Sequence, residues 1–233
     1  MIKFKKKLSI IIPVYNEKNT IEKVLNKIYK LKNIKKEIIV VDDASYDGST
    51  NILKKNKNKI TILIHHKKNM GKGSALRTGI RLASGNIILI QDADLEYNPD
   101  DYQKLLQPFI ETDADVVYGT RFKGGQYSRL HFFWHYVANK ILTTITNIFT
   151  NLNMSDMETG YKLFKSEVIK SIKLTENSFG IEPEITIKLA KKNYIFYEVP
   201  ISYNGRSYEQ GKKITFLDAF RAIYCIFKYK FFN

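Results

Sequence analysis

Short apolar runs alternate along this chain with segments of helical periodicity, and that alternation limits the folds open to it. Five runs of buried-strand character occupy residues 8–12, 37–41, 60–64, 87–90 and 115–118. Between them, Asn19 and Glu22 have the spacing of a helix capping box, Asp47 and Gly48 open a short helix, and Gly71 leads into a helix that ends near residue 83. This βαβαβ order predicts an α/β fold with a doubly wound, mainly parallel sheet and helices on both faces.

A different pattern begins beyond Gly119. An aromatic-rich segment covers residues 127–149, and strand-like runs at 160–164 and 195–199 flank a helical segment at 184–191. A polar loop at 204–213 then leads to a final helix from Phe216. Because 233 residues suit one α/β domain with a small extension, we expect residues 1–233 to form a single domain.

The fourth apolar run ends in an acidic segment that contains Asp92, Asp94 and Glu96. If the backbone stays extended there, its side-chain period of two places the three carboxylates on one face, where they repel one another without a cation. Hard oxygen ligands favour Mg²⁺ or Mn²⁺, and a donor set this small is typical of a metal that also binds substrate phosphates. The alternative is a solvated turn, because D-x-D is a common sequence.

Polar residues also follow the first two runs, with Tyr15 and Glu17 after the first and Asp42 and Asp43 after the second. In open parallel sheets, ligands bind beyond the carboxyl ends of the strands. Three polar clusters at one sheet edge therefore predict a binding site there.

The chain is strongly basic, with 38 Lys and Arg against 23 Asp and Glu, or +15 at pH 7. Such a charge favours contact with polyanions, which include nucleic acid, an anionic membrane and phosphorylated substrates, although solvated faces explain most lysine runs. Cys225 is the only cysteine, so no internal disulfide can form and we expect a reducing compartment. No stretch approaches 18 apolar residues, so we expect no transmembrane helix.

Nine motifs carry a resemblance that covers most of the chain. They lie, in order, at residues 12–17, 41–45, 47–49, 69–73, 91–97, 119–122, 156–162, 179–184 and 204–207. In this order they resemble the motifs of an inverting family 2 glycosyltransferase of the GT-A fold, and more narrowly those of the polyprenyl-phosphate, or dolichyl-phosphate, sugar synthases. Glu96 departs from members that carry Gln there, and residues 124–139 match the family's acceptor segment loosely.

The resemblance implies an enzyme that moves a hexose from UDP- or GDP-hexose to a polyprenyl phosphate with inversion, using Mg²⁺ or Mn²⁺. It implies a nucleotide-sugar half over about residues 1–120 and an acceptor half over about residues 121–233. The main alternative is a family 2 enzyme that acts on a sugar hydroxyl in glycolipid or surface-polysaccharide assembly, which needs a carboxylate base. A polyanion-binding module without catalytic activity would explain the charge but not the acidic segment.

The resemblance also assigns donor-side residues. Pro13, Tyr15 and Glu17 would surround the nucleoside, and Asp43 would accept from a base N–H. The residues implied for the metal are Asp92, which is shared with the ribose, Asp94 and Glu96. The cations implied for the donor phosphates are Lys72, Arg206, Lys212 and Lys213, with a plain exposed basic loop as the alternative for the last three.

On the acceptor side, Arg121 would bind the acceptor phosphate. Asp156 and Glu182 would hold sugar hydroxyls, and either could serve as base for a hydroxyl acceptor, but purely structural roles fit them nearly as well. His131 and His135 have the spacing of two metal ligands, yet their aromatic neighbours favour packing or lipid contact over zinc.

The final helix combines a narrow polar stripe, comprising Asp218, Arg221, Cys225 and Lys228, with an otherwise apolar surface. A helix of this kind belongs either to the core or to a membrane interface, and both readings stay open. With the basic charge and a lipid acceptor, we expect a cytoplasmic protein that binds peripherally to the anionic cytoplasmic face of the membrane. We expect no nucleic acid partner.

Overall fold

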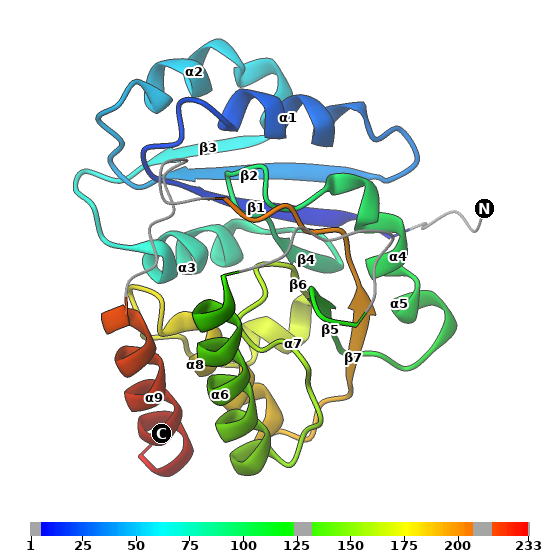
Figure 1. The fold of residues 1–233 in the computed structure, drawn as a ribbon. Helices are drawn as coiled ribbons and strands as arrows, with labels where there is room; N and C mark the ends of the chain where they lie inside the picture. Colours follow the sequence, from blue (N-terminus) through cyan, green and yellow to red (C-terminus); the bar gives the residue numbers. More distant parts are fainter. Residues whose placement is uncertain (1–5, 124–131, 207–215, 233) are drawn as a thin grey trace.

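A seven-stranded sheet forms the centre of the computed structural model, which describes residues 6–123, 132–206 and 216–232 (Figure 1). Its strands are β1 (Leu8–Val14), β2 (Lys36–Asp42), β3 (Ile62–His65), β4 (Ile87–Ile90), β5 (Val116–Thr120), β6 (Lys162–Lys165) and β7 (Phe196–Pro200). Their order in space is β3-β2-β1-β4-β6-β5-β7. The strand β6 runs antiparallel to both neighbours and the other pairs are parallel, which confirms the mainly parallel sheet.

Helices cover both faces of the sheet (Figure 1). On one face lie α1 (Ile21–Lys30), α2 (Ser49–Lys55) and α4 (Tyr102–Leu106). On the other lie α3 (Lys72–Leu82), α6 (Phe133–Thr150), α7 (Ser166–Lys170), α8 (Ile181–Ala190) and α9 (Phe216–Phe231). The short elements η1 (Lys57–Lys59), η2 (Pro99–Asp101) and α5 (Pro108–Glu111) complete the described chain.

Two hydrophobic cores, one on each side of the sheet, hold these layers together. In β1, Ile10 and Ile12 point into the core beneath α1 while Ile11 points into the core beneath α3, as the two-residue period of a strand requires. All three side chains are fully buried. Strand β1 therefore carries consecutive apolar residues, which is typical of a strand covered by helices on both faces.

The sequence located most elements to within a few residues, but the capping box was wrong. The residue before α1 is Thr20, and its side chain makes no capping hydrogen bond to the helix. Its hydroxyl donates instead to the Glu17 carboxylate at 2.9 Å, while Glu22 accepts from Asn56, the residue after α2, at 3.2 Å. Side chains of the expected capping type are therefore used for contacts between elements.

One face of the C-terminal helix α9 belongs to the core, which is one of the two readings that the sequence left open. Its polar side chains Arg221 and Lys228 form ion pairs with Glu176, at 3.2 and 2.9 Å, and Cys225 is buried nearby. The polar stripe therefore packs on the protein. Ala222, Cys225, Ile226 and Tyr229 belong to the core, so this face of the helix is structural.

The carboxylate of Glu37 ties the amino ends of β1 and β2 to the loop before β4. It is buried and accepts from Ser84 N and Oγ at 2.7 Å, from Gly85 N at 3.1 Å, and from Ser9 and Lys7. Burial alone would raise the pKa of Glu37, but these donors lower it to about 2. The ionised carboxylate is thus a fixed part of the fold.

We expect Glu37→Gln to lower the free energy of unfolding by about 2–3 kcal/mol at pH 7, because several donors lose a charged acceptor. The pKa of Glu37 is below its ordinary value, so its contribution is complete above pH 4.5 and disappears as pH falls toward 2. The difference from the wild type should therefore shrink in acid. Urea unfolding at pH 7 and pH 3.5 measures this difference in stability. Glu167→Gln, at an exposed position, is the control. Equal urea midpoints of Glu37→Gln and wild type at pH 7 would contradict the prediction.

Candidate active site

The carboxyl ends of β1, β2 and β4 lie together at one edge of the sheet. Asp43 N donates to Val14 O at 2.8 Å, and Gln91 N donates to Ile11 O at 3.0 Å. These bonds bring the segments that follow the three strands side by side. The polar clusters predicted from the sequence therefore meet at this edge, as expected for a parallel sheet.

The acidic segment bends immediately after β4, so the argument from an extended strand was wrong. Glu96 N donates to Asp94 Oδ1 at 3.1 Å, an Asx-type turn in a segment that bends over residues 93–96. Asp94 is buried, and burial together with the charges of Asp92 and Glu96 raises its pKa to about 7. A turn, rather than a strand face, therefore brings the charges of Asp92 and Glu96 near Asp94.

Arg206 lies among the carboxylates of this segment. Its Nη2 donates to Asp94 Oδ2 at 2.6 Å, its backbone N donates to Glu96 Oε1 at 2.9 Å, and its Nη1 reaches Glu17 at 3.3 Å. Burial opposes the charged guanidinium, but the surrounding carboxylates outweigh that cost and raise the pKa of Arg206. The loop predicted to bind donor phosphates thus contacts the predicted metal ligands through this residue.

The donor set suits Mg²⁺ or Mn²⁺ by its chemistry, since Asp92, Asp94 and Glu96 offer hard oxygens. Within the described residues, however, no group of three or more His, Cys, Asp or Glu side chains is arranged to hold one ion. Arg206 supplies the positive charge between Asp94 and Glu96 instead. A metal could use these oxygens only after Arg206 moves away from them.

Lys72, the first residue of α3, joins the acidic segment to α8. Its Nζ lies 2.9 Å from Asp92 Oδ1 and 3.0 Å from Glu182 Oε1. Burial acts against its charge, but the two carboxylates raise the pKa of Lys72 well above the usual range. Its position depends on Gly71, which has φ +91° and approaches the backbone of Asn177 so closely that a Cβ would overlap it.

Asp43 is only 2% exposed and supports the loop before Lys72. Its carboxylate accepts from Gly71 N at 2.7 Å and from Met70 N at 3.0 Å, and it pairs with His66 Nδ1 at 2.7 Å. In this conformation the carboxylate is bound by protein donors. Recognition of a nucleoside base by Asp43 stays a prediction.

Pro13, Tyr15 and Glu17 line the end of β1. Tyr15 packs edge-on against Tyr46 with ring centroids 6.1 Å apart, and Tyr46 is largely exposed. Glu17 Oε2 accepts from Thr20 at 2.9 Å and faces Arg206. An aromatic pair beside a carboxylate is suited to a nucleoside, with ring stacking for the base and an acceptor for the ribose.

Arg121, which follows β5, forms a two-pronged ion pair with Asp156. Its Nε donates to Oδ2 and its Nη2 to Oδ1, both at 2.6 Å, and Asn139 Nδ2 donates to the same carboxylate at 2.9 Å. Burial would raise the pKa of Asp156, but Arg121 lowers it, so the carboxylate stays ionised. The guanidinium also lies 5.2 Å from the Tyr203 ring centroid.

A buried charged cluster lies beside the Lys72 pairs. Lys162, 1% exposed, donates to the carbonyl oxygens of Met157 and Thr159 and lies 4.7 Å from the Tyr118 ring centroid. Burial lowers the pKa of Lys162 to about 8. Burial, and next the charge of Glu182, raise the pKa of Glu158 to about 8.

Comparison with known proteins decides the family. The model of glycosyl transferase family 2 matches residues 9–173. The chain belongs to glycosyltransferase family 2. A dolichol-phosphate mannosyltransferase from Pyrococcus furiosus is 29% identical over 96% of this chain, which spans 64% of that relative's length. An uncharacterised protein from Methanocaldococcus jannaschii is 32% identical, and the match covers 88% of this chain and 93% of that protein's length.

The fold of the glycosyltransferase also matches solved structures. Glucosyl-3-phosphoglycerate synthase from Mycobacterium tuberculosis, in complex with Mn²⁺, UDP and glucosyl-3-phosphoglycerate, superposes with a TM-score of 0.75 at 17% identity. The match covers 97% of this chain and 80% of that one. The complex of the same enzyme with Mg²⁺ and UDP superposes with a TM-score of 0.72. These neighbours confirm the GT-A fold.

The structure brings most of the predicted site residues of this glycosyltransferase together, but in pairs that the sequence did not predict. Arg206 contacts the acidic segment, Lys72 bridges Asp92 and Glu182, and Arg121 binds Asp156. Lys212, Lys213 and His131 lie outside the described residues. His135 packs near Phe132, with ring centroids 5.7 Å apart.

Sequence reasoning missed Glu158, Thr159 and Lys162 in the glycosyltransferase, although all three lie within a motif that carried the resemblance. The signal available was a charged pair four residues apart, Glu158 and Lys162, at the start of an apolar strand. A lysine inside a buried strand needs compensating partners, which this structure supplies.

Proposed function

We propose that this glycosyltransferase transfers a hexose from a nucleoside-diphosphate sugar to a polyprenyl monophosphate and inverts the anomeric carbon. The observation that carries the proposal is the alternation of charge at one sheet edge. Carboxylates that suit a divalent cation meet two cations, Lys72 and Arg206, that suit a diphosphate. The likeness to a dolichol-phosphate mannosyltransferase supports the lipid phosphate as acceptor.

On the donor side, Tyr15 and Glu17 would contact the nucleoside, and Asp92, Asp94 and Glu96 would hold Mg²⁺ or Mn²⁺. A bound divalent cation supplies charge that neutralises the departing diphosphate. The guanidinium of Arg206 donates to Asp94 at 2.6 Å and to Glu96 at 3.4 Å here. When a donor binds, the same guanidinium can turn to the phosphates, because carboxylate and phosphate both fit its planar fork.

On the acceptor side, a phosphate is already anionic at neutral pH and needs no strong base. The protein's task is to position it and to offset its charge. Arg121 uses Nε and Nη2 for Asp156, and Nη1 carries two further N–H donors that suit a phosphate oxygen.

A sugar hydroxyl is the second candidate acceptor, and it requires a general base. Asp156 suits that role poorly, because Arg121 lowers its pKa and occupies both carboxylate oxygens. Glu182 suits it better, since its Oε2 is buried without a hydrogen-bond partner among the described residues.

The test uses purified protein with radiolabelled GDP-mannose and UDP-glucose, each with Mn²⁺. Undecaprenyl phosphate or dolichyl phosphate is offered as the only acceptor. We expect labelled product that extracts into organic solvent and releases sugar in mild acid. Labelling of a glycolipid hydroxyl acceptor, with none on either lipid phosphate, would favour the second candidate.

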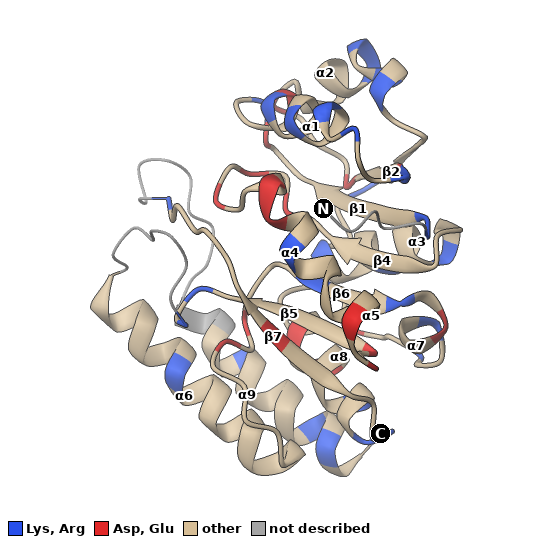
Figure 2. Cartoon of the chain, turned by 90° about the vertical axis from the view of Figure 1, so that its right-hand side faces the viewer, with Lys and Arg blue, Asp and Glu red and all other residues tan. Residues whose placement is uncertain are grey.

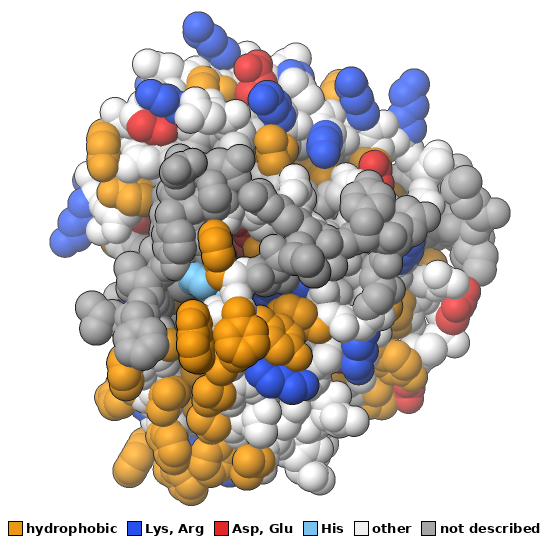
Figure 3. Space-filling view, in the orientation of Figure 1, with side chains coloured by type: hydrophobic (Ala, Val, Ile, Leu, Met, Phe, Trp, Pro, Cys, Tyr) orange, Lys and Arg blue, Asp and Glu red, His pale blue; other side chains and the backbone are white. Residues whose placement is uncertain are grey.

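An apolar surface on α6 and α9 supports a place at the membrane. The helices lie side by side, with Phe149 packed against Phe227 at 5.1 Å, and Figure 3 shows hydrophobic side chains gathered over them. The exposed members of this surface are Phe132, Phe133, Trp134, Tyr136, Ile141, Ile148, Phe220, Tyr224, Phe227, Phe231 and Phe232. In the described part of the chain, no helix is long and apolar enough to cross a bilayer.

We propose that this surface binds peripherally to the cytoplasmic face of an anionic membrane. Exposed aromatic side chains insert at the interface, and nearby Lys and Arg contribute on the order of 1 kcal/mol each near anionic lipid. Away from this apolar surface, Lys and Arg side chains are spread over α1, α2 and α7 among other elements (Figure 2). Such scattered charge fits solvated faces, so a nucleic acid partner is not part of the proposal.

Replacing Phe133, Trp134 and Phe220 together by Ser should lower the fraction bound to anionic vesicles at least about fivefold, because three inserted aromatic groups are lost. Deleting α9 would be a less informative test, because one face of this helix packs in the core and its loss would also disturb folding. Flotation with phosphatidylglycerol vesicles measures binding. Tyr29→Ser, an exposed aromatic on the distant α1, is the matched control. Unchanged flotation of a folded triple variant would refute the surface.

A further inference from the structure

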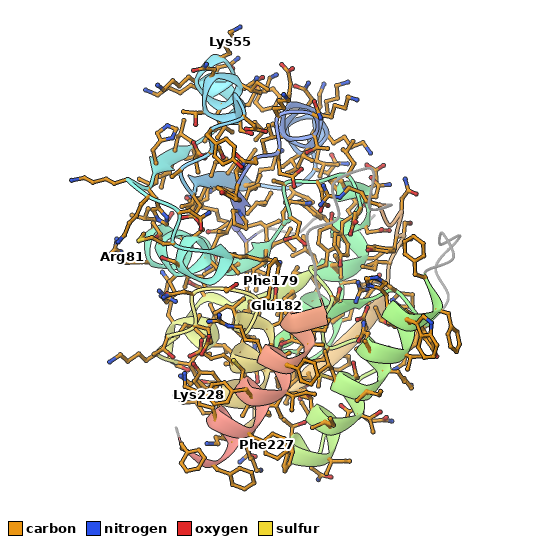
Figure 4. The ribbon with its side chains drawn as sticks, turned by 60° about the vertical axis from the view of Figure 1, so that its left-hand side comes forward. Lys55, Arg81, Phe179, Glu182, Phe227 and Lys228 are labelled. Atoms are coloured by element: carbon orange, nitrogen blue, oxygen red, sulfur yellow. The ribbon has the colours of Figure 1, made fainter. Side chains whose placement is uncertain are left out.

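Glu176, in the loop between α7 and α8, is bound by both α3 and α9. Its side chain is buried, and its carboxylate faces α9. Lys228 Nζ and Tyr229 OH donate to Oε1 at 2.9 and 2.7 Å, and Arg221 Nη2 donates to Oε2 at 3.2 Å. Burial alone would raise the pKa of Glu176, but these donors lower it to about 2, so the carboxylate is ionised at neutral pH. One acid thus holds three side chains of the final helix, of which Figure 4 labels Lys228.

The backbone of Glu176 and Asn177 closes the amino end of α3. Gly73 N and Ser74 N, two donors that a helix leaves unpaired in its first turn, both donate to Asn177 O, at 2.9 and 3.3 Å. One turn further along α3, the guanidinium of Arg77 donates to Glu176 O and to Asn177 Oδ1. The start of α3 is therefore fixed by the same residue whose acidic side chain is bound by α9.

Lys72 lies at this junction, between two glycines. A Cβ at Gly71 would overlap the carbonyl oxygen of Asn177. A Cβ at Gly73 would overlap the carbonyl oxygen of Glu176. Only residues without a side chain allow so close an approach of two backbone segments. The backbone on both sides of Lys72 therefore rests on residues 176–177, and from there its ammonium group reaches the two carboxylates described above.

We propose that Glu176 is a positioning residue, which holds Lys72 in place for the donor diphosphate by tying the start of α3 to α9. This inference rests on the proposed function, in which Lys72 binds the donor phosphates. A lysine carries its charge at the end of a flexible stem, so the place of that charge depends on a fixed backbone. Glu176 acts through that backbone and not by contact with the substrate. It also joins the donor site to the helix that exposes Phe227 in the apolar surface.

A double-mutant cycle tests this route, because a residue that acts only through Lys72 loses its effect once Lys72 is replaced. Glu176→Gln removes the charge that binds α9 and keeps the size of the side chain. Calorimetry with UDP and with GDP, each with Mn²⁺, measures the affinity for the diphosphate. We expect Glu176→Gln to weaken this affinity about fivefold or more, since a charge-assisted bond is misaligned. In the Lys72→Met background the same change should alter the affinity less than about twofold.

A second variant approaches the junction from the other helix. Arg77→Met removes the donors to the backbone of residues 176–177 and leaves the bonds between Glu176 and α9 in place. It should weaken diphosphate binding in the same way, and again only when Lys72 is present. Arg81→Met is the matched control, since it makes the same change one turn further along α3 at an exposed position (Figure 4). Exposed Glu167→Gln is the control for Glu176→Gln.

The outcomes separate positioning from a purely structural role and from the proposed function. A structural role would lower the melting temperature but leave the diphosphate affinity of the folded variants unchanged, or weaken it equally with and without Lys72. Either result overturns the inference alone. If Glu176→Gln does not fold, the cycle of Arg77→Met with Lys72→Met decides. If the wild type binds neither UDP nor GDP, the proposed function fails, and this inference fails with it.

Discussion

Asp94→Asn is expected to lower turnover at least about a hundredfold while the protein stays folded. The carboxylate is buried between Asp92 and Glu96 and accepts a 2.6 Å bond from Arg206. In the proposed function it holds the cation that offsets charge on the departing diphosphate. Losing that stabilisation costs at least about 3 kcal/mol of transition-state free energy, which corresponds to the expected rate loss.

The matched control is Asp100→Asn, which makes the same chemical change six residues away at an exposed position. Initial rates at saturating donor and acceptor measure the effect, and thermal melting monitors the fold. A direct measurement of Mn²⁺ binding by calorimetry separates loss of metal from loss of chemistry. Near-normal rates in Asp94→Asn, or in wild type with excess chelator, would remove the metal from the mechanism.

The strands were predictable because their limits are set by local chemistry. The apolar run at 87–90 became β4 without a change of bounds, since Gly85 and Asn86 precede it and Gln91 and Asp92 follow. The acidic segment could not be placed in the same way. Whether a chain continues extended or turns depends on one side chain accepting from the backbone two residues later, and Asp94 does so here.

The composition of the site was also predictable, but its pairing was not. Polar residues after parallel strands must meet at one edge. Which cation meets which carboxylate depends on loops that are far apart in sequence, such as Glu17 and Arg206, separated by 189 residues. The polar stripe of α9 shows the same limit, because a sequence pattern cannot tell a stripe facing solvent from one that faces Glu176.

The second large effect concerns the ion pair of Arg121 and Asp156. Asp156 is 0% exposed, and two guanidinium bonds of 2.6 Å hold its charge. Removing one partner of a buried ion pair leaves an uncompensated charge, which commonly costs 3–5 kcal/mol. The pair therefore supports the acceptor side of the fold as well as any phosphate contact of Arg121.

We expect Arg121→Ala to lower the free energy of unfolding by about 3–5 kcal/mol at pH 7, whereas Arg81→Ala, an exposed arginine on α3, should change it little. In the wild type Arg121 holds the pKa of Asp156 below its ordinary value, so the carboxylate stabilises the fold above that value and loses this effect in acid. In the Arg121→Ala variant, burial without Arg121 raises the pKa of Asp156, so the difference in stability between variant and wild type should narrow as pH falls.

Adding Asp156→Asn to Arg121→Ala should then recover stability, because it removes the unpaired charge. Further destabilisation of the double variant in urea unfolding would show that the ion pair is not what holds this part of the protein.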